Sequence, residues 1–177
     1  LRYAVLIAVL GTGGYMHRDT FEQGEDTTDR RQYHWLNEFI RGLPDGALIA
    51  GPPHIMDDVA VQGRHSVLVN FKLSHPWWDG YYPEIKRRTI ASFEALYATD
   101  TAAINRLYDE YGVSYFVVGR SYYNPRLIDR GRFYVNPYNT LINRLTPVEE
   151  DFVLENPPPE SVVYDEGAYL VVQLPLR

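Results

Sequence analysis

Apolar positions along this chain form either short continuous runs or runs with helical spacing. Residues 47–50 and 113–118 are almost continuously apolar, which is typical of strands buried on both faces of a sheet. A third strand is predicted over residues 66–71. Apolar positions three and four residues apart predict helices over residues 30–41, 84–98 and from Thr99 or Asp100 to Tyr111, with a shorter one over 139–145.

The order of these elements indicates the fold class. Strands that alternate with helices predict an α/β fold with a mostly parallel central sheet, covered by helices in three layers. Residues 161–164 and 168–174, joined by a turn that contains Gly167, predict a C-terminal antiparallel hairpin at the edge of that sheet. We therefore expect a single soluble α/β domain over residues 30–177.

The first ten residues form an apolar run interrupted only by Arg2. A membrane-spanning helix needs about 20 such residues, so this run cannot cross a bilayer by itself. Two interpretations stay open: the end of a transmembrane helix, or a buried first element of the domain. We expect residues 1–29 to comprise this segment and a connector rich in Gly, Thr and acidic residues.

Composition narrows the classes of function. The 177 residues have a net charge of −6 and contain no Cys, which argues against nucleic-acid binding and excludes thiol catalysis and Cys-ligated metals. The chain also lacks the P-loop, the G-x-S-x-G elbow and the G-x-G-x-x-G spacing of dinucleotide sites. We expect no cofactor and no metal, and because no motif identifies a reaction we expect the domain by itself to be non-catalytic.

An aromatic cluster is the first candidate binding site. Its side chains can stack on the C–H faces of sugars, while the carboxylate between them accepts hydroxyl protons; exposed Trp and Tyr also anchor proteins at membranes or partners. The alternative is that the rings only pack on the domain core. The cluster comprises Trp77, Trp78, Asp79, Tyr81 and Tyr82, and the basic run 86–88 follows near the start of the next helix.

A segment rich in Arg and Tyr is the second candidate. Arginine presents a fork of donors that suits phosphate oxygens, and within residues 119–139 the only acidic residue is Asp129. The alternative is a structural loop held by salt bridges and tyrosine hydrogen bonds. Its cations are Arg120, Arg126, Arg130 and Arg132.

A third, polar candidate follows the predicted strand 47–50. Ligands of open α/β sheets bind beyond the carboxyl ends of strands, where His54, Asp57 and Asp58 would lie. These residue types can act as acids, bases or metal ligands, although their spacing matches no specific metal motif. Helix capping and surface polarity are the alternative roles.

The series of motifs from residue 46 to 119 resembles a known class of domain. It includes Gly46-Ala-Leu-Ile-Ala-Gly-Pro-Pro53, Gly63-Arg-His-Ser-Val-Leu-Val69 and Tyr111-Gly-Val-Ser-Tyr-Phe-Val-Val118. The series resembles the C-terminal extracytoplasmic domain of bacterial polytopic membrane proteins of the GT-C glycosyltransferase-like class. The resemblance implies a parent that uses a lipid-linked sugar at the outer face of the membrane and has its catalytic acid in another part of the chain.

These patterns lead to three hypotheses about function. The first is an accessory extracytoplasmic domain whose partners are the transmembrane part of its own chain and a lipid-linked sugar or glycan acceptor. The second is a stand-alone α/β hydrolase that uses His54 with Asp57 or Asp58. The third is a protein-interaction module that uses the aromatic cluster.

Overall fold

The computed structural model describes Thr12 and residues 33–128, 134–135, 137–146 and 151–176. Contacts divide the chain into two compact units, Leu1–His34 and Trp35–Arg177. The apolar run 1–10 lies outside the described residues. All of the sheet and almost all of the described helices belong to the second unit.

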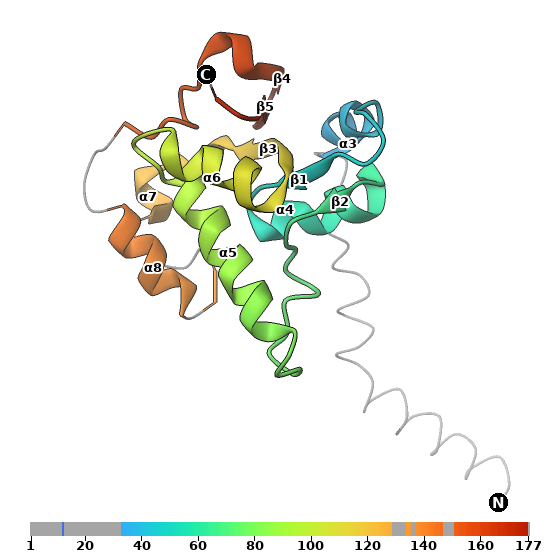
Figure 1. Ribbon diagram of the computed structural model, residues 1–177, viewed down its shortest axis with the longest axis vertical. Helices are drawn as coiled ribbons and strands as arrows, with labels where there is room; N and C mark the ends of the chain where they lie inside the picture. The colour runs from blue at the N-terminus through green and yellow to red at the C-terminus, as the bar shows by residue number, and fades with distance from the viewer. Residues whose placement is uncertain (1–11, 13–32, 129–133, 136, 147–150, 177) are drawn as a thin grey trace, which may run out of the picture. The chain divides into compact units, whose positions relative to one another are not determined.

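Helices and strands alternate through most of this unit (Figure 1). The strands are β1 (Leu48–Ala50), β2 (Ser66–Val67), β3 (Val113–Gly119), β4 (Val162–Glu166) and β5 (Tyr169–Gln173). The α-helices are α3 (His34–Arg41), α4 (Pro53–Asp58), α5 (Tyr82–Leu96), α6 (Ala102–Tyr111), α7 (Pro125–Ile128) and α8 (Tyr138–Leu145). A π-helical turn, η2 (Val59–Gly63), continues α4, and the 3-10 turns η3 (Arg120–Tyr123) and η4 (Pro159–Ser161) follow β3 and precede β4.

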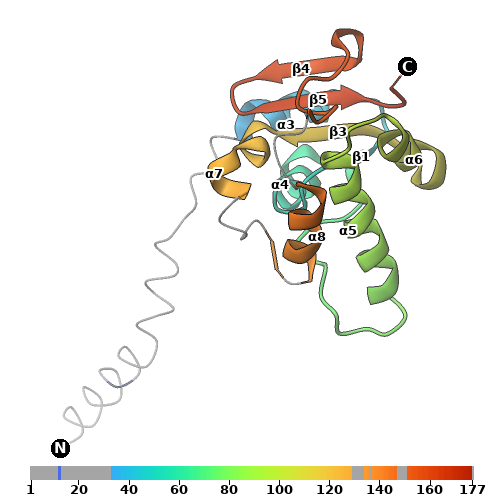
Figure 2. The ribbon, with the colours of Figure 1, turned by 90° about the vertical axis from the view of Figure 1, so that its left-hand side faces the viewer.

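The five strands form one mixed sheet in the order β2-β1-β3-β5-β4. Strands β2, β1 and β3 are parallel, and β5 pairs antiparallel with both β3 and β4. The α/β class, the parallel strands with flanking helices and the C-terminal hairpin are confirmed. Figure 2 shows the hairpin alongside β3, with α5 and α8 on the other side of that strand.

Strand β2 is shorter than the predicted strand over 66–71, and hydrogen bonds explain the difference. The side-chain oxygen of Asn70 accepts a hydrogen bond from the N–H of Leu73 at 3.0 Å. The N–H of Phe71 donates to the carbonyl oxygen of Pro53 at 3.1 Å instead of continuing the ladder. The chain therefore turns away from the sheet towards α4.

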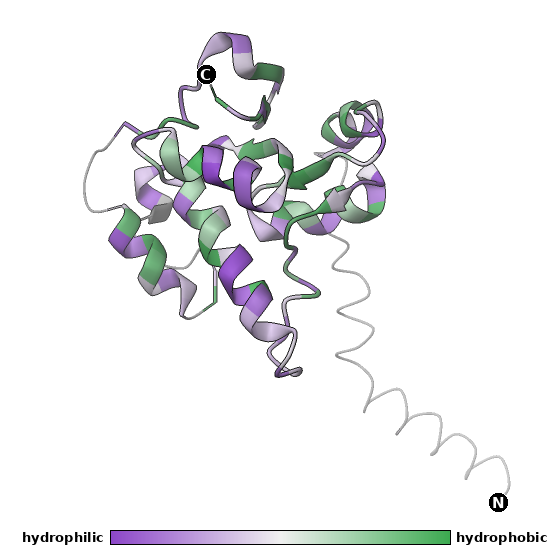
Figure 3. Cartoon of the chain, viewed as in Figure 1, coloured by the Kyte–Doolittle hydropathy of each residue, from purple (hydrophilic) through white to green (hydrophobic). Residues whose placement is uncertain are grey.

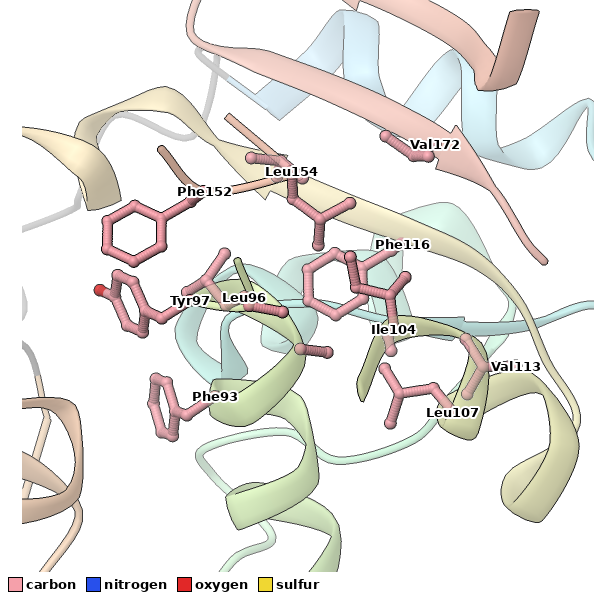
Figure 4. Close-up of a cluster of buried hydrophobic side chains, with 14 of the residues drawn as sticks. Phe93, Leu96, Tyr97, Ile104, Leu107, Val113, Phe116, Phe152, Leu154 and Val172 are labelled. Carbon is pink, nitrogen blue, oxygen red and sulfur yellow. The ribbon is translucent and has the colours of Figure 1, made fainter. Parts of the chain in front are cut away.

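The main core lies between the sheet and the helices α5, α6 and α8. Alternate residues of β3 point to opposite faces, so Phe116 and Val118 enter this core while Val117 lies on the other face. Phe116 is completely buried. Figure 4 shows Phe116 with other members of the same core, which include Phe93, Leu96, Tyr97, Ile104, Leu107, Val113, Phe152, Leu154 and Val172.

Close packing also explains Gly51, which directly follows β1. A Cβ atom there would lie 2.7 Å from the carbonyl oxygen of Val117 and 2.9 Å from the Cε of Met56. The absence of a side chain lets the chain leave β1 and enter α4 directly against β3.

Within the described part of the chain, no helix combines the length and the apolar character that crossing a bilayer requires.

Candidate functional site

The segment between β2 and α5 contains the predicted aromatic cluster, and we call residues 72–81 the aromatic loop. Before it, the N–H of Phe71 is bonded to the first residue of α4. At its end, the carbonyl oxygen of Trp78 accepts hydrogen bonds from the N–H groups of Tyr81 and Tyr82 at 3.0 and 2.9 Å. The loop is thus attached at both ends and projects beside the first turn of α5 (Figures 1 and 2).

The large apolar side chains of the aromatic loop face solvent. Trp77 and Trp78 are 77% and 72% exposed, Leu73 is 65% exposed and Tyr81 is 42% exposed. Tyr82, within α5, is half-buried. The two tryptophans therefore do not pack on the core, and the structure presents them for contact with another molecule.

The carboxylate of the aromatic cluster, Asp79, is exposed between the tryptophans and Tyr81. His75, which precedes the tryptophans in the sequence, is also exposed, and its ring centroid lies 5.4 Å from that of Trp77. The structure therefore presents acceptor oxygens and aromatic faces on one short segment.

Helix α4 holds the base of the aromatic loop. The Oδ1 atom of Asp57 accepts a hydrogen bond from the N–H of Lys72 at 2.9 Å. The ring of His54 lies 4.2 Å from that of Phe71 and 5.3 Å from that of Tyr134, measured between centroids. The polar candidate beyond β1 is therefore adjacent to the aromatic loop and contributes to its support.

Desolvation by its neighbouring rings lowers the pKa of His54, and the nearby negative charge of Asp57 partly opposes this shift. Asp58 is buried at the end of α4. The described residues contain no group of three or more His, Asp or Glu side chains that could hold a metal ion. The three polar residues share one short helix, and the described contacts of His54 and Asp57 are structural.

Positive charge gathers around the aromatic loop. The only two lysines of the chain are Lys72, the first residue of the loop, and Lys86, which follows the loop in α5; both are exposed. In the first turns of α5, Glu84 forms ion pairs with Arg87 and Arg88, and the hydrogen bond from Arg88 is the main cause that lowers the pKa of Glu84. Figure 3 shows these turns as strongly hydrophilic.

The arginines of the second candidate segment do not join the aromatic loop. The guanidinium of Arg120 forms an ion pair with Asp165 of β4, at the opposite end of the unit from the loop (Figures 1 and 2). Arg126 is exposed in α7. Arg130 and Arg132 lie outside the described residues, so the predicted anion site is described only in part.

The tyrosines of that segment belong mainly to the core. The hydroxyl of Tyr123 donates to the carbonyl oxygen of Leu96 at 2.8 Å, and burial raises its pKa well above the ordinary value. Tyr134 packs edge-on against Phe93, and burial also raises the pKa of Tyr138, to about 12. These rings stabilise the domain rather than present a binding surface.

Hollows elsewhere on the unit are small or shallow. A cleft of about 140 Å³ lies between α5 and α6 and has charged residues of both signs, including Arg87, Glu94 and Arg106. A broader depression of about 470 Å³ lies beside the Arg120–Asp165 ion pair. Neither brings together a nucleophile, a base and an orienting group of the kind that covalent catalysis requires.

Sequence reasoning missed two members of the exposed surface, Leu73 and Lys72. Both directly follow the predicted strand over residues 66–71, where an apolar residue such as Leu73 is expected to be buried. The signal was Asn70, because an Asn can end a strand by bonding to a backbone N–H three residues later.

Comparisons with known proteins identify a fold. No family model and no curated protein sequence matches the chain. Among solved structures, the chain is similar to the C-terminal globular domain of the oligosaccharyltransferase from Archaeoglobus fulgidus. The two are 10% identical, with a TM-score of 0.52 over 82% of this chain and 97% of that domain. The likeness extends over almost the whole of the archaeal domain and defines the architecture of this one.

Proposed function

We propose that this chain is a non-catalytic accessory domain of a membrane-embedded, glycosyltransferase-like protein at the extracytoplasmic face of the membrane. The aromatic loop contacts carbohydrate, either the sugar of a lipid-linked donor or a glycan acceptor. The observation that carries this proposal is the exposure of Trp77 and Trp78 beside the carboxylate of Asp79. The fold, which resembles a domain of an oligosaccharyltransferase, supports it.

The roles of the loop residues follow from their chemistry. The indole faces of Trp77 and Trp78 cover the C–H surface of a pyranose ring, and Asp79 accepts hydrogen bonds from its hydroxyl groups. Tyr81 and Tyr82, at the start of α5, border the same segment and complete the aromatic surface. No bond is made or broken by these residues.

Nuclear magnetic resonance can test carbohydrate binding in the absence of lipid. Oligosaccharides of glucose, mannose, galactose and N-acetylglucosamine are titrated into the labelled chain, and the three indole N–H resonances are followed. We expect at least one sugar to shift the resonances of Trp77 and Trp78 but not that of Trp35, which lies on α3.

Matched variants assign the contact. W77A, W78A and D79N should weaken binding, whereas W35F, which alters the third exposed tryptophan, should bind as the unmodified chain does. The proposed carbohydrate contact would be contradicted if no sugar shifts the indole resonance of Trp77 or Trp78. It would also be contradicted if W77A and W78A bind sugar as tightly as the unmodified chain does.

The proposal that this domain belongs to a membrane protein is tested separately, by reading the gene sequence. The coding sequence that precedes Leu1 should encode several apolar segments of membrane-spanning length. A start codon a few residues before Leu1 would contradict membership in a polytopic membrane protein.

The two other hypotheses have less support. A hydrolase would need Asp57 free to assist His54, but Asp57 bonds to the backbone of Lys72, and the exposed ring of His54 packs against Phe71. A pure interaction module would use the same exposed rings, and loss of partner capture without loss of sugar binding in W77A would favour it.

A further inference from the structure

The aromatic loop combines exposed apolar groups of two kinds. Leu73 is aliphatic and 65% exposed, while Trp77 and Trp78 present indole rings that are more than two-thirds exposed. A cluster of exposed large apolar side chains on one short segment marks a surface that another phase or molecule covers. The side chain of Leu73 contains no polar atom. A molecule that covers this surface therefore needs an apolar part that contacts Leu73, in addition to a part that stacks on the indole rings.

Charge around the loop has the opposite sign to that of the whole chain. Residues 71–88 contain four cations, Lys72, Lys86, Arg87 and Arg88, and two carboxylates, although the chain carries a net charge of −6. Among the described residues the ammonium group of neither lysine forms an ion pair, although the Asp57 carboxylate accepts a hydrogen bond from the backbone N–H of Lys72. A local excess of positive charge on a segment that also exposes large apolar side chains favours an anionic target at that segment.

The arrangement in space places the charge beside the apolar groups. Lys72 precedes Leu73 directly, and Lys86 lies in the second turn of α5, just after the tryptophan-containing turn. Figures 1 and 2 show this segment projecting from the domain, at the far end from the β4–β5 hairpin. A projecting segment with Trp, Tyr and Leu at its surface and cations at its sides is the arrangement that binds the interfacial region of anionic membranes.

We propose that the aromatic loop docks on an anionic lipid bilayer, with Leu73, Trp77 and Trp78 in the headgroup region and with Lys72 and Lys86 against lipid phosphates. The inference rests on the proposed function in that a domain of a membrane protein lies close to a bilayer. A lipid-linked sugar also lies at headgroup level, so docking brings the loop to the depth at which such a substrate is found.

Vesicles without any carbohydrate provide the test. The chain of residues 1–177 is mixed with vesicles of phosphatidylcholine alone, or of phosphatidylcholine with about a quarter phosphatidylglycerol, and the bound fraction is measured by flotation. Tryptophan fluorescence is quenched with brominated lipids in the same samples. We expect binding to the anionic vesicles that weakens with salt, little binding to the neutral ones, and quenching of Trp77 and Trp78.

Two pairs of variants assign this binding to the loop and not to the apolar run 1–10, which every variant retains. W77S/W78S should lower the vesicle affinity about tenfold or more, whereas W35S should leave it unchanged. K86E should weaken binding to anionic vesicles, whereas R144E, the same charge change at an exposed position of α8, should not. Circular dichroism confirms that each variant folds.

The outcomes separate this inference from the proposed carbohydrate contact. D79N should weaken sugar binding but not vesicle binding, because it removes a negative charge from the docking surface; K86E should do the reverse. Vesicle binding that is equal for neutral and anionic lipid, or unchanged in W77S/W78S, would overturn the lipid inference and leave a glycan or a protein as the target. Failure of the sugar titration alone would overturn only the carbohydrate contact.

Discussion

The carboxylate of Asp57 and the backbone N–H of Lys72 are joined by a hydrogen bond of 2.9 Å that ties α4 to the base of the aromatic loop. Asp57 lies in a helix that directly follows the buried strand β1, so its position is fixed by the sheet. Lys72 is the first residue of the loop. The bond therefore transmits the rigidity of the core to an exposed segment that otherwise has few contacts of its own.

Asp57→Ala should loosen the aromatic loop. Removal of a charged acceptor of a backbone N–H should cost about 1–2 kcal/mol of unfolding free energy at this exposed site. Hydrogen exchange of the amides of Lys72 and Leu73 should accelerate, and urea titration should report the loss of stability. Asp109→Ala, at an exposed position of α6, serves as the control. Unchanged exchange at Lys72 would show that the bond does not restrain the loop.

His54 should titrate below its ordinary value. Partial desolvation disfavours the imidazolium, so the folded-state pKa lies below 6.5. The unfolded chain then binds the proton more readily, and the stability that neutral His54 contributes is present above the unfolded pKa and is lost as the pH falls through the folded one. A titration of the His54 ring resonance checks the midpoint. His54→Gln should reduce the pH dependence of stability in this acidic window, and an unaltered dependence would contradict the assignment.

The sequence predicted most elements of the fold because their signals are local. Near-continuous apolar runs identified β1 and β3, and α6 ends at Tyr111 as predicted, directly before Gly112, which has a positive φ. Strand β2 was predicted to be too long, because the turn at Asn70 depends on a bond to the side chain rather than on hydrophobicity. The hairpin was predicted because β-forming residues lie on both sides of Gly167.

The sequence predicted which residues form the candidate site, but it did not predict which of their side chains are exposed to solvent. Aromatic residues such as Trp77 and Tyr123 have the same signature in a sequence whether they pack or project. Tyr123 is buried because β3 places it against α5 and Phe152, whereas Trp77 lies beyond the end of any covering element. Such a distinction depends on tertiary contacts, and local pattern does not contain it.

Asn105→Ala should destabilise the C-terminal end of the sheet. The side chain of Asn105 accepts a hydrogen bond from the N–H of Leu176 at 2.7 Å and donates one to its carbonyl oxygen at 2.9 Å. Loss of both bonds leaves buried backbone groups without partners and should cost about 1–3 kcal/mol. Chemical denaturation measures the change. Asn143→Ala, at an exposed position of α8, should have little effect, and equal effects of the two variants would contradict the argument.

Phe116→Ala should have the largest effect among these substitutions. The ring is fully buried between the sheet and α5, and its removal leaves a cavity that should cost about 3–5 kcal/mol. Urea unfolding followed by circular dichroism measures this loss. Val163→Ala, on the exposed edge strand, should change stability by about 0.5 kcal/mol or less. A loss below about 1 kcal/mol for F116A would show that the core collapses around the site.

Tryptophan fluorescence should change little when the domain unfolds. The three tryptophans, Trp35, Trp77 and Trp78, are 63%, 77% and 72% exposed in the folded chain. Their emission should already be that of hydrated indole, and acrylamide should quench it efficiently. Circular dichroism must therefore report unfolding, and a large red shift of the emission at the same midpoint would contradict the exposure described for the aromatic loop.

Strand β3 receives its second neighbour, β5, from the final stretch of the chain, with Phe116 opposite Val172. During synthesis on the ribosome, one edge of β3, the central strand, has no pairing partner until the residues around 173 have emerged. Until then the nascent chain exposes unpaired backbone groups that can pair with foreign strands. Folding of this domain is accordingly completed only once its last strand is available, and chaperones should engage the nascent domain until β5 has paired.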